Sequence, residues 1–360
     1  MIGLQICKSY IPASSLRVRA RKRRRSCILG VLVSALCFEV VLRPFVADSN
    51  HLGVRTIRNY FEGLSVGHFE ADGLGEIGSR LTGNARLRDA REGMIIGDSH
   101  VVANAVRDEE TMGSVVERLS RSAGRPLNVR QYGWHGANAP TFLASADSLI
   151  RARNPAWVAI ILNSYNIGMN ALVTSSDWRM DVASDYSFRL IDERPHRHGR
   201  WQTLRRLAAH SVLALGLGRR LALFQIRLAQ ESYVEGTASQ KHESRLDEQA
   251  ARVPRASVLG LKRAFGGRLL IVYAPQLLGP GHYSLEPIET ELQRLCAEQG
   301  AAFLSVRAAL EQDRNDHLRL SRGFHNTAPG VGHFNAVGHR IVGEQIWRYL
   351  YTHSSPPIRT

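Results

Sequence analysis

Five short apolar runs recur along the chain, and each is followed by sequence compatible with a helix. Unbroken apolar runs of this length are typical of parallel strands covered on both faces. Their alternation with helices predicts an α/β fold with a three-layer, doubly wound parallel sheet of flavodoxin-like type. The predicted strands are Met94–Gly97, Leu127–Tyr132, Trp157–Leu162, Leu269–Tyr273 and Ala302–Val306.

Amphipathic stretches between and after these runs predict the helices. The final helix places Val342, Ile346 and Leu350 on one face, which is the spacing of a helix packed on a core. The predicted helices are Met112–Ser122, Ala139–Ala152, Ile288–Gln299 and Ala336–Tyr351.

An insertion, residues 168–267, separates the third and fourth predicted strands. A loop of this length is seldom structureless. Trp201–Leu228 is rich in Leu and Arg and predicts two short amphipathic helices, whereas the polar stretch Glu231–Pro254 is expected to be mobile. The insertion is therefore predicted to be mainly helical. An extra helical pair packed on the domain is preferred to a lid or a membrane-surface element.

The first residues differ in character from the rest. The basic run RVRARKRRR (17–25) precedes the apolar stretch SCILGVLVSALCFEVVL (26–42). This pattern predicts a basic cytoplasmic tail (1–25), an inner-membrane signal anchor (26–46) and a periplasmic body. A cleaved signal and a buried helix are the alternatives. Residues 47–90 form a lead-in without an assigned role, and residues 91–354 form the main domain.

Composition narrows the partners and cofactors. The formal net charge is +15, but dense basic sequence is confined to residues 17–25, which contain no aromatic residue. Nucleic-acid binding needs a basic stripe interleaved with stacking aromatics, so no nucleic-acid partner is predicted. Three of the four cysteines lie before residue 38, so Cys296 has no partner within the body. No intradomain disulfide, metal site or cofactor is predicted.

Polar residues gather where the predicted strands end. The run MIIGDSHVV (94–102) puts Ser99 after the first strand, QYGWHGANAP (131–140) puts Gly136 after the second, and ILNSYNIG (161–168) puts Asn163 and Asn166 after the third. GHFNAVGH (332–339) adds His333 before the last helix. A serine needs a base to become a nucleophile, and an oxyanion needs preorganised N–H donors. These residue types therefore suit acyl transfer.

These four blocks resemble, in order and separation, the motifs of the SGNH (GDSL-like) hydrolase superfamily. The resemblance covers roughly residues 92–352, apart from the insertion. It implies that Ser99 is the nucleophile and His333 the base. It also implies an oxyanion hole formed by the backbone N–H groups of Ser99 and Gly136 and by an asparagine amide, with Asn166 preferred and Asn163 kept open.

Three positions depart from that pattern. The family has Asp three residues before the catalytic histidine, where this chain has Gly330. A backbone carbonyl, a water or a distant carboxylate must then orient His333, and nothing in the sequence places Asp313 or Asp316 near it. The third block lacks the usual Gly-x-Asn-Asp form. His100 stands where a Leu-like residue is usual.

Several polar residues near these blocks are expected to have structural roles. Asp98 is predicted to cap a turn, His100 to form local hydrogen bonds, and His339 to serve the last helix. Trp134 and His135 either line a substrate pocket or pack locally. The spacing of His325, His333 and His339 matches no helix-based pattern of metal ligands.

The sequence thus predicts a membrane-anchored serine esterase or O-acyltransferase. The resemblance implies that its substrate is an acylated carbohydrate that carries O-acetyl groups on an envelope or exported polysaccharide. Other esters remain open as substrates. The alternative is a non-catalytic glycan-binding or assembly component that kept the SGNH fold after losing the acid at position 330.

Overall fold

The structure is a computed structural model of the 360-residue chain. The chain forms two compact units, residues 48–200 with 235–360, and residues 1–47 with 201–234. Of the second of these, only Val33, Ser34 and Cys37 are described, so the fold below is that of the first. The described residues are 33–34, 37, 49–51, 53–59, 62–63, 65–167, 172, 177–193, 244–275, 287–325, 327, 330 and 332–353.

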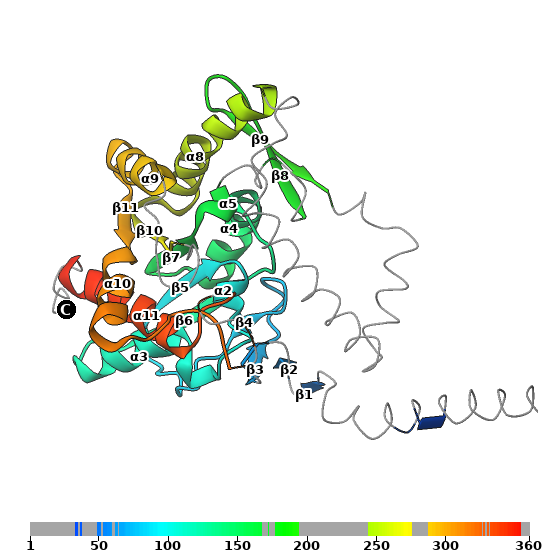
Figure 1. Cartoon of the computed structure of the whole chain (residues 1–360), viewed down its shortest axis with the longest axis vertical. Helices are drawn as coiled ribbons and strands as arrows, with labels where there is room; N and C mark the ends of the chain where they lie inside the picture. Colours follow the sequence, from blue (N-terminus) through cyan, green and yellow to red (C-terminus); the bar gives the residue numbers. More distant parts are fainter. Residues whose placement is uncertain are drawn as a thin grey trace, which may run out of the picture. The chain divides into compact units, whose positions relative to one another are not determined.

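A central sheet carries five parallel strands in the order β6-β5-β7-β10-β11 (Figure 1). Numbered within this set, the order is 2-1-3-4-5, the flavodoxin-like arrangement. All five predicted strands and the predicted fold class are confirmed. The strands are β5 (Arg91–Gly97), β6 (Leu127–Gly133), β7 (Trp157–Leu162), β10 (Leu269–Tyr273) and β11 (Ala302–Ser305).

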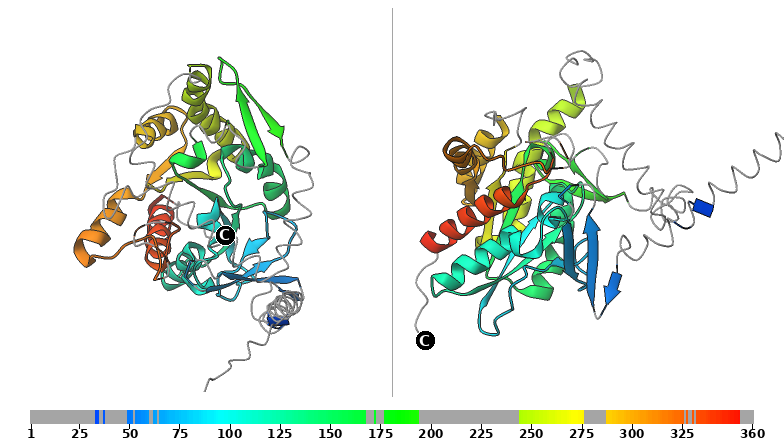
Figure 2. Two further views of the ribbon diagram at one scale, coloured as in Figure 1. Left: turned by 45° about the vertical axis from the view of Figure 1, so that its right-hand side comes forward. Right: turned by 60° about the horizontal axis from the view of Figure 1, so that its bottom comes forward.

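Helices cover both faces of this sheet (Figure 2). Alternate side chains of each strand point into the two cores. In β5, Met94 and Ile96 point into one core, and Ile95 points into the other. The first core is covered by α4 (Ala139–Arg153), α8 (Ser244–Phe265) and α9 (Pro287–Glu298), and the second by α3 (Met112–Ser122), α10 (Arg307–His317) and α11 (Ala336–His353). The four predicted helices are confirmed to within two residues at each end.

The lead-in extends the sheet beyond β6 with four antiparallel strands. Its attachment depends on Arg80, whose side chain is fully buried. Arg80 donates to the carbonyl of Val106 at 2.8 Å and lies 3.1 Å from the Asp108 carboxylate. The strands are β1 (Ser49–His51), β2 (Val54–Asn59), β3 (Ser65–Glu70) and β4 (Ser79–Arg80).

The insertion differs in part from the prediction. It contains an antiparallel hairpin, β8 (Trp178–Val182) and β9 (Phe188–Asp192), which packs on α8 through Met180 and Val253. The polar stretch expected to be mobile from Glu231 is helical from Ser244 onward, and α8 continues through Pro254. Buried apolar residues from Val253 onward, including Val258 and Leu261, anchor this helix. The predicted pair at Trp201–Leu228 lies outside the described residues.

The predicted anchor, residues 26–46, lies outside the described residues except for Val33, Ser34 and Cys37. Within the described part of the chain, no helix is both long enough and apolar enough to span a bilayer.

Candidate functional site

Ser99 begins a one-turn helix, α2 (Ser99–Val102), directly after β5. Asp98 caps this helix, because its carboxylate accepts the His100 N–H at 2.9 Å, and this confirms the predicted capping role. The turn ends at Ala103 in the left-handed region, with φ 56°. The Ser99 N–H is a first-turn amide, and no hydrogen bond among the described residues uses it. The turn therefore presents both a hydroxyl and a free donor at the sheet edge.

His333 lies beside Ser99, as the sequence analysis expected. Its Nε2 is 2.7 Å from the Ser99 Oγ, although 234 residues separate the two. The Gly323 N–H donates to the His333 carbonyl at 3.2 Å, which ties the backbone of His333 to the loop before α11. This distance permits direct proton transfer from the serine to the imidazole.

The other ring nitrogen of His333 meets a residue that the sequence analysis did not single out. Nδ1 is in hydrogen-bond contact with the carboxylate of Glu62, in the turn between β2 and β3. The Glu62 side chain is 17% exposed, so its carboxylate is largely withdrawn from solvent. The distant carboxylate that the sequence left open therefore comes from the lead-in. Glu62 matches no motif, and 271 residues separate it from His333, so the sequence held no local signal for it.

His100 supports the loop that carries His333. The Phe334 N–H approaches its Nδ1 at 3.2 Å, and a guanidinium N–H of Arg322 approaches its Nε2 at 2.9 Å. A neutral imidazole has one acceptor nitrogen, so only one contact is a full hydrogen bond in a given tautomer. Burial, followed by the charge of Arg322, holds the pKa of His100 well below 6.5. A neutral His100 therefore packs 5.1 Å from the His333 ring, measured between centroids.

The second predicted donor, Gly136, has a backbone suited to that role. It has φ 67°, and no hydrogen bond among the described residues uses its N–H. The preceding strand is tied to β5 there, because the Trp134 N–H donates to the Gly97 carbonyl at 3.2 Å. Gly136 thus lies at the same sheet edge as Ser99, one strand away.

Asn166 does not match its predicted role. Its side-chain amide donates to the Asp98 carboxylate at 3.1 Å and to the Ala137 carbonyl at 2.8 Å, so both hydrogens are engaged. Its oxygen accepts the Asn163 N–H at 2.8 Å. Asn166 is fully buried and joins the ends of β5, β6 and β7. The preferred side-chain donor is therefore a framework residue, because a donor that serves two buried acceptors is not free for an oxyanion.

The side-chain amide of Asn163 donates fewer hydrogen bonds than that of Asn166. Its amide donates to the Asp98 carboxylate at 3.1 Å, and its oxygen accepts the N–H groups of Tyr165 and Asn166. Of the two asparagines, Asn163 is the one whose amide has a second N–H that no hydrogen bond among the described residues engages.

A second histidine–carboxylate pair flanks Gly136. The Glu76 carboxylate accepts a hydrogen bond from the backbone N–H of His135 at 2.6 Å, and it lies 3.0 Å from the ring Nδ1 of the same residue. The hydrogen bond to Glu76 raises the pKa of His135, although burial opposes it. Burial acts to raise the pKa of Glu76, but its hydrogen bond and charge interaction with His135 lower it overall. The ring of the neighbouring Trp134 packs against that of Phe142, with 6.2 Å between the ring centroids, so local packing accounts for this aromatic.

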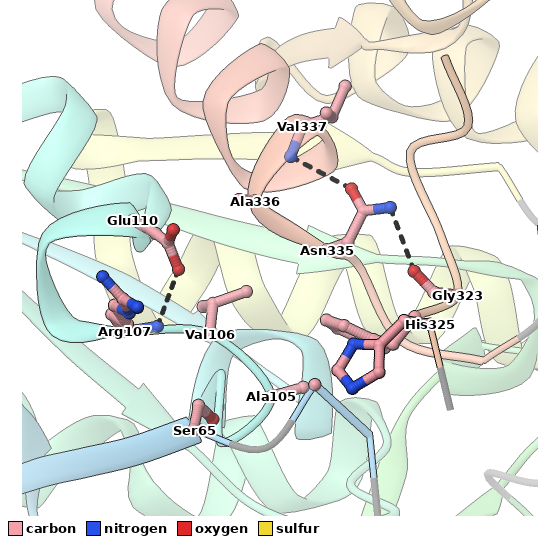
Figure 3. Close-up of a pocket in the computed structure, with 12 residues that line it drawn as sticks. Ser65, Ala105, Val106, Arg107, Glu110, Gly323, His325, Asn335, Ala336 and Val337 are labelled. Carbon is pink, nitrogen blue, oxygen red and sulfur yellow. Dashed lines mark hydrogen bonds between the residues drawn. The ribbon is translucent and has the colours of Figure 1, made fainter. Parts of the chain in front are cut away.

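A cavity of about 470 Å³ is lined by residues of the lead-in, of the segment after α2 and of the loop before α11 (Figure 3). Gly63 and Ser65 line it from the lead-in, and Phe324, His325 and Asn335 line it from the loop around His333. None of the predicted site residues lines this cavity. Among the described residues, no group of three or more His, Cys, Asp or Glu side chains is arranged to hold a metal ion.

No protein-family model matches the chain, and no match is found among curated proteins. Solved structures with a similar fold include a lipase/acylhydrolase from Enterococcus faecalis, at 13% identity and TM-score 0.42, covering 74% of this chain and 98% of that one. An acetylxylan esterase from Geobacillus stearothermophilus has 15% identity and TM-score 0.38, with 73% and 95% covered. A putative lipolytic protein of the G-D-S-L family from Desulfitobacterium hafniense has 12% identity and TM-score 0.33. That match covers 71% of this chain and 98% of the other. At such values the reaction must be argued from the site.

Proposed function

We propose that this protein transfers acyl groups from esters through a covalent intermediate on Ser99. The observation that carries the proposal is the 2.7 Å contact between Ser99 Oγ and His333 Nε2. A serine at a strand-to-helix turn, with an imidazole in hydrogen-bond reach, is the arrangement that makes a hydroxyl nucleophilic at neutral pH.

The reaction would proceed in two halves. Ser99 Oγ attacks the carbonyl carbon of the ester while its proton passes to His333 Nε2. The bond to the leaving alkoxide then breaks, and the alkoxide takes that proton. In the second half, water or an acceptor hydroxyl gives its proton to Nε2 and attacks the acyl-enzyme. Ser99 leaves as the alcohol when it recovers the proton.

The oxyanion would be stabilised by the backbone N–H groups of Ser99 and Gly136, with the second N–H of Asn163 as the side-chain donor. These groups belong to segments that follow β5, β6 and β7, three neighbouring strands of the sheet. Donors held by the backbone and by the Asp98 network would stabilise the oxyanion with little reorganisation in the transition state.

The substrate class follows from the sequence resemblance and the predicted topology. We infer that the esters are O-acetyl groups on an envelope or exported polysaccharide. Hydrolysis and transfer to a sugar hydroxyl differ only in which acceptor attacks the acyl-enzyme, so both activities fit one site.

An active-site-directed fluorophosphonate probe tests the proposal. Wild type is expected to be labelled and Ser99→Ala to be unlabelled, because the probe reacts only with an activated serine. Ser148→Ala, an exposed serine on α4, is the matched control and should label like wild type. If folded wild type stays unlabelled at high protein concentration while it binds an acetylated glycan, the non-catalytic alternative is correct.

A further inference from the structure

We propose that Glu62, carried by the lead-in, is the carboxylate that positions His333. It takes the place of the acid that the SGNH pattern would put at position 330. This inference rests on the proposed function for its kinetic consequence, but its structural test is independent of turnover.

The two ring nitrogens of His333 have complementary partners. Nε2 faces the Ser99 hydroxyl, and Nδ1 faces the Glu62 carboxylate. A carboxylate at Nδ1 keeps the proton there, so Nε2 remains free to accept the proton of the serine. The same charge stabilises the imidazolium that forms during acyl transfer.

The turn that carries Glu62 is shaped to hold it in place. The Asn59 side-chain amide donates to the Glu62 carbonyl at 2.7 Å. Gly63 has φ 78°, and a Cβ there would lie 2.2 Å from the Ala105 carbonyl and 2.7 Å from the Phe324 ring. Only glycine fits so close an approach in this backbone region. The turn is therefore packed between the segment after α2 and the loop before His333.

The loop before His333 is in turn shaped to admit Glu62. Gly330 offers no side chain at the position of the expected acid. Gly332 has φ 95°, and a Cβ there would lie 2.3 Å from Glu62 Oε1. The loop therefore lacks its own carboxylate and leaves room for one from the lead-in.

Other contacts tie the lead-in to the segment after Ser99. The Ser65 hydroxyl donates to the backbone carbonyl of Asn104. The Asp108 carboxylate accepts the backbone N–H of His68 at 3.0 Å. β3 is thus held beside the segment that follows the nucleophile turn. The lead-in accordingly forms part of the catalytic unit.

Kinetics of the full chain on an acetyl ester test the positioning role. Glu62→Ala and Glu62→Gln are expected to lower kcat by about 10²- to 10⁴-fold with little change in KM, because this carboxylate contacts the ring nitrogen of His333 that does not face Ser99. Asp316→Asn, an exposed acid closer to His333 in sequence, is the control and should match wild type. Wild-type kcat in both Glu62 variants would overturn the inference.

Proton NMR gives a readout that needs no turnover. The Nδ1–H of His333 should give a low-field resonance in wild type and in Ser99→Ala, and His333→Gln should remove it. Glu62→Ala should also abolish the resonance, and its persistence in that variant would overturn the inference. The inference would therefore survive an unlabelled wild type, which would refute only the proposed function.

Gly332→Ala tests the inference while Glu62 itself stays in place. The added methyl group should displace the carboxylate, weaken the low-field resonance and lower kcat. If Gly332 acts through Glu62, the double variant with Glu62→Ala should lose no more activity than Glu62→Ala alone. A wild-type resonance and wild-type kcat in folded Gly332→Ala would count against the inference.

Discussion

At the residue scale, the polar groups under the turn that carries Ser99 form one buried network. Asp98 caps α2 and accepts from Asn163 and Asn166, while Asn166 also binds the Ala137 carbonyl. Residue type alone marked these asparagines as candidate donors. Their different roles depend on which acceptors lie within reach in the fold, and the sequence does not contain that information. The capping role of Asp98 was predictable, because it depends on neighbours in the chain.

A pH dependence of stability follows from His339, which is 1% exposed. Burial, with the charges of Arg80 and His333, lowers its pKa from 6.5 to about 3. In the unfolded chain His339 takes up a proton below pH 6.5, whereas in the folded chain it stays neutral. Its contribution to stability is therefore constant above pH 6.5 and is lost as the pH falls towards 3, by up to about 1.4 kcal/mol per pH unit.

Urea unfolding at pH 7.5, 6.0 and 5.0 measures this dependence. His339→Leu should lower the slope of the unfolding free energy below pH 6.5 by roughly 1 kcal/mol per pH unit. His317→Gln removes an exposed histidine and should keep the wild-type slope. An unchanged slope in His339→Leu would contradict the buried, neutral histidine.

At the element scale, the parallel strands were predictable, because strands covered on both faces appear as unbroken apolar runs. The antiparallel lead-in gave no such signal. In β3 buried residues alternate with more exposed ones, as expected for a half-covered strand, and β4 has only two residues. The hairpin β8–β9 was missed for the same reason. Continuous apolar runs therefore predict the parallel centre of the sheet but not its antiparallel edge, β1 to β4.

The attachment of the lead-in depends on a close approach at Gly67. A Cβ there would lie 1.3 Å from a guanidinium nitrogen of Arg80, which is fully buried and cannot move aside into solvent. Gly67→Ala should lower the free energy of unfolding by about 2–4 kcal/mol, because it displaces a buried cation from Asp108. Urea unfolding measures this loss. Gly267→Ala, where nothing lies within 4 Å of the added Cβ, should change stability by less than about 1 kcal/mol.

At the scale of the whole molecule, the candidate site joins distant parts of the sequence. Glu62 comes from the lead-in, Ser99 and Gly136 from the first half of the parallel sheet, and His333 from the loop before the last helix. Motifs predicted the serine and the histidine, because each lies in a recognisable block. The acid could not be predicted, since its contact depends on how the lead-in docks against the sheet.

The orientation of the whole chain across a membrane remains a prediction from residues 17–46. Cations at the amino-terminal flank of an apolar stretch favour retention of that end in the cytoplasm. A reporter that is active only in the periplasm should therefore be active when fused after residue 50 and inactive when fused after residue 25. Replacing Arg21, Lys22 and Arg23 with glutamate should reduce the activity of the residue-50 fusion, because it removes the charge asymmetry. A cytoplasmic reporter active after residue 50 in the unmodified chain would refute this topology, and with it the assignment of an exported polysaccharide as substrate.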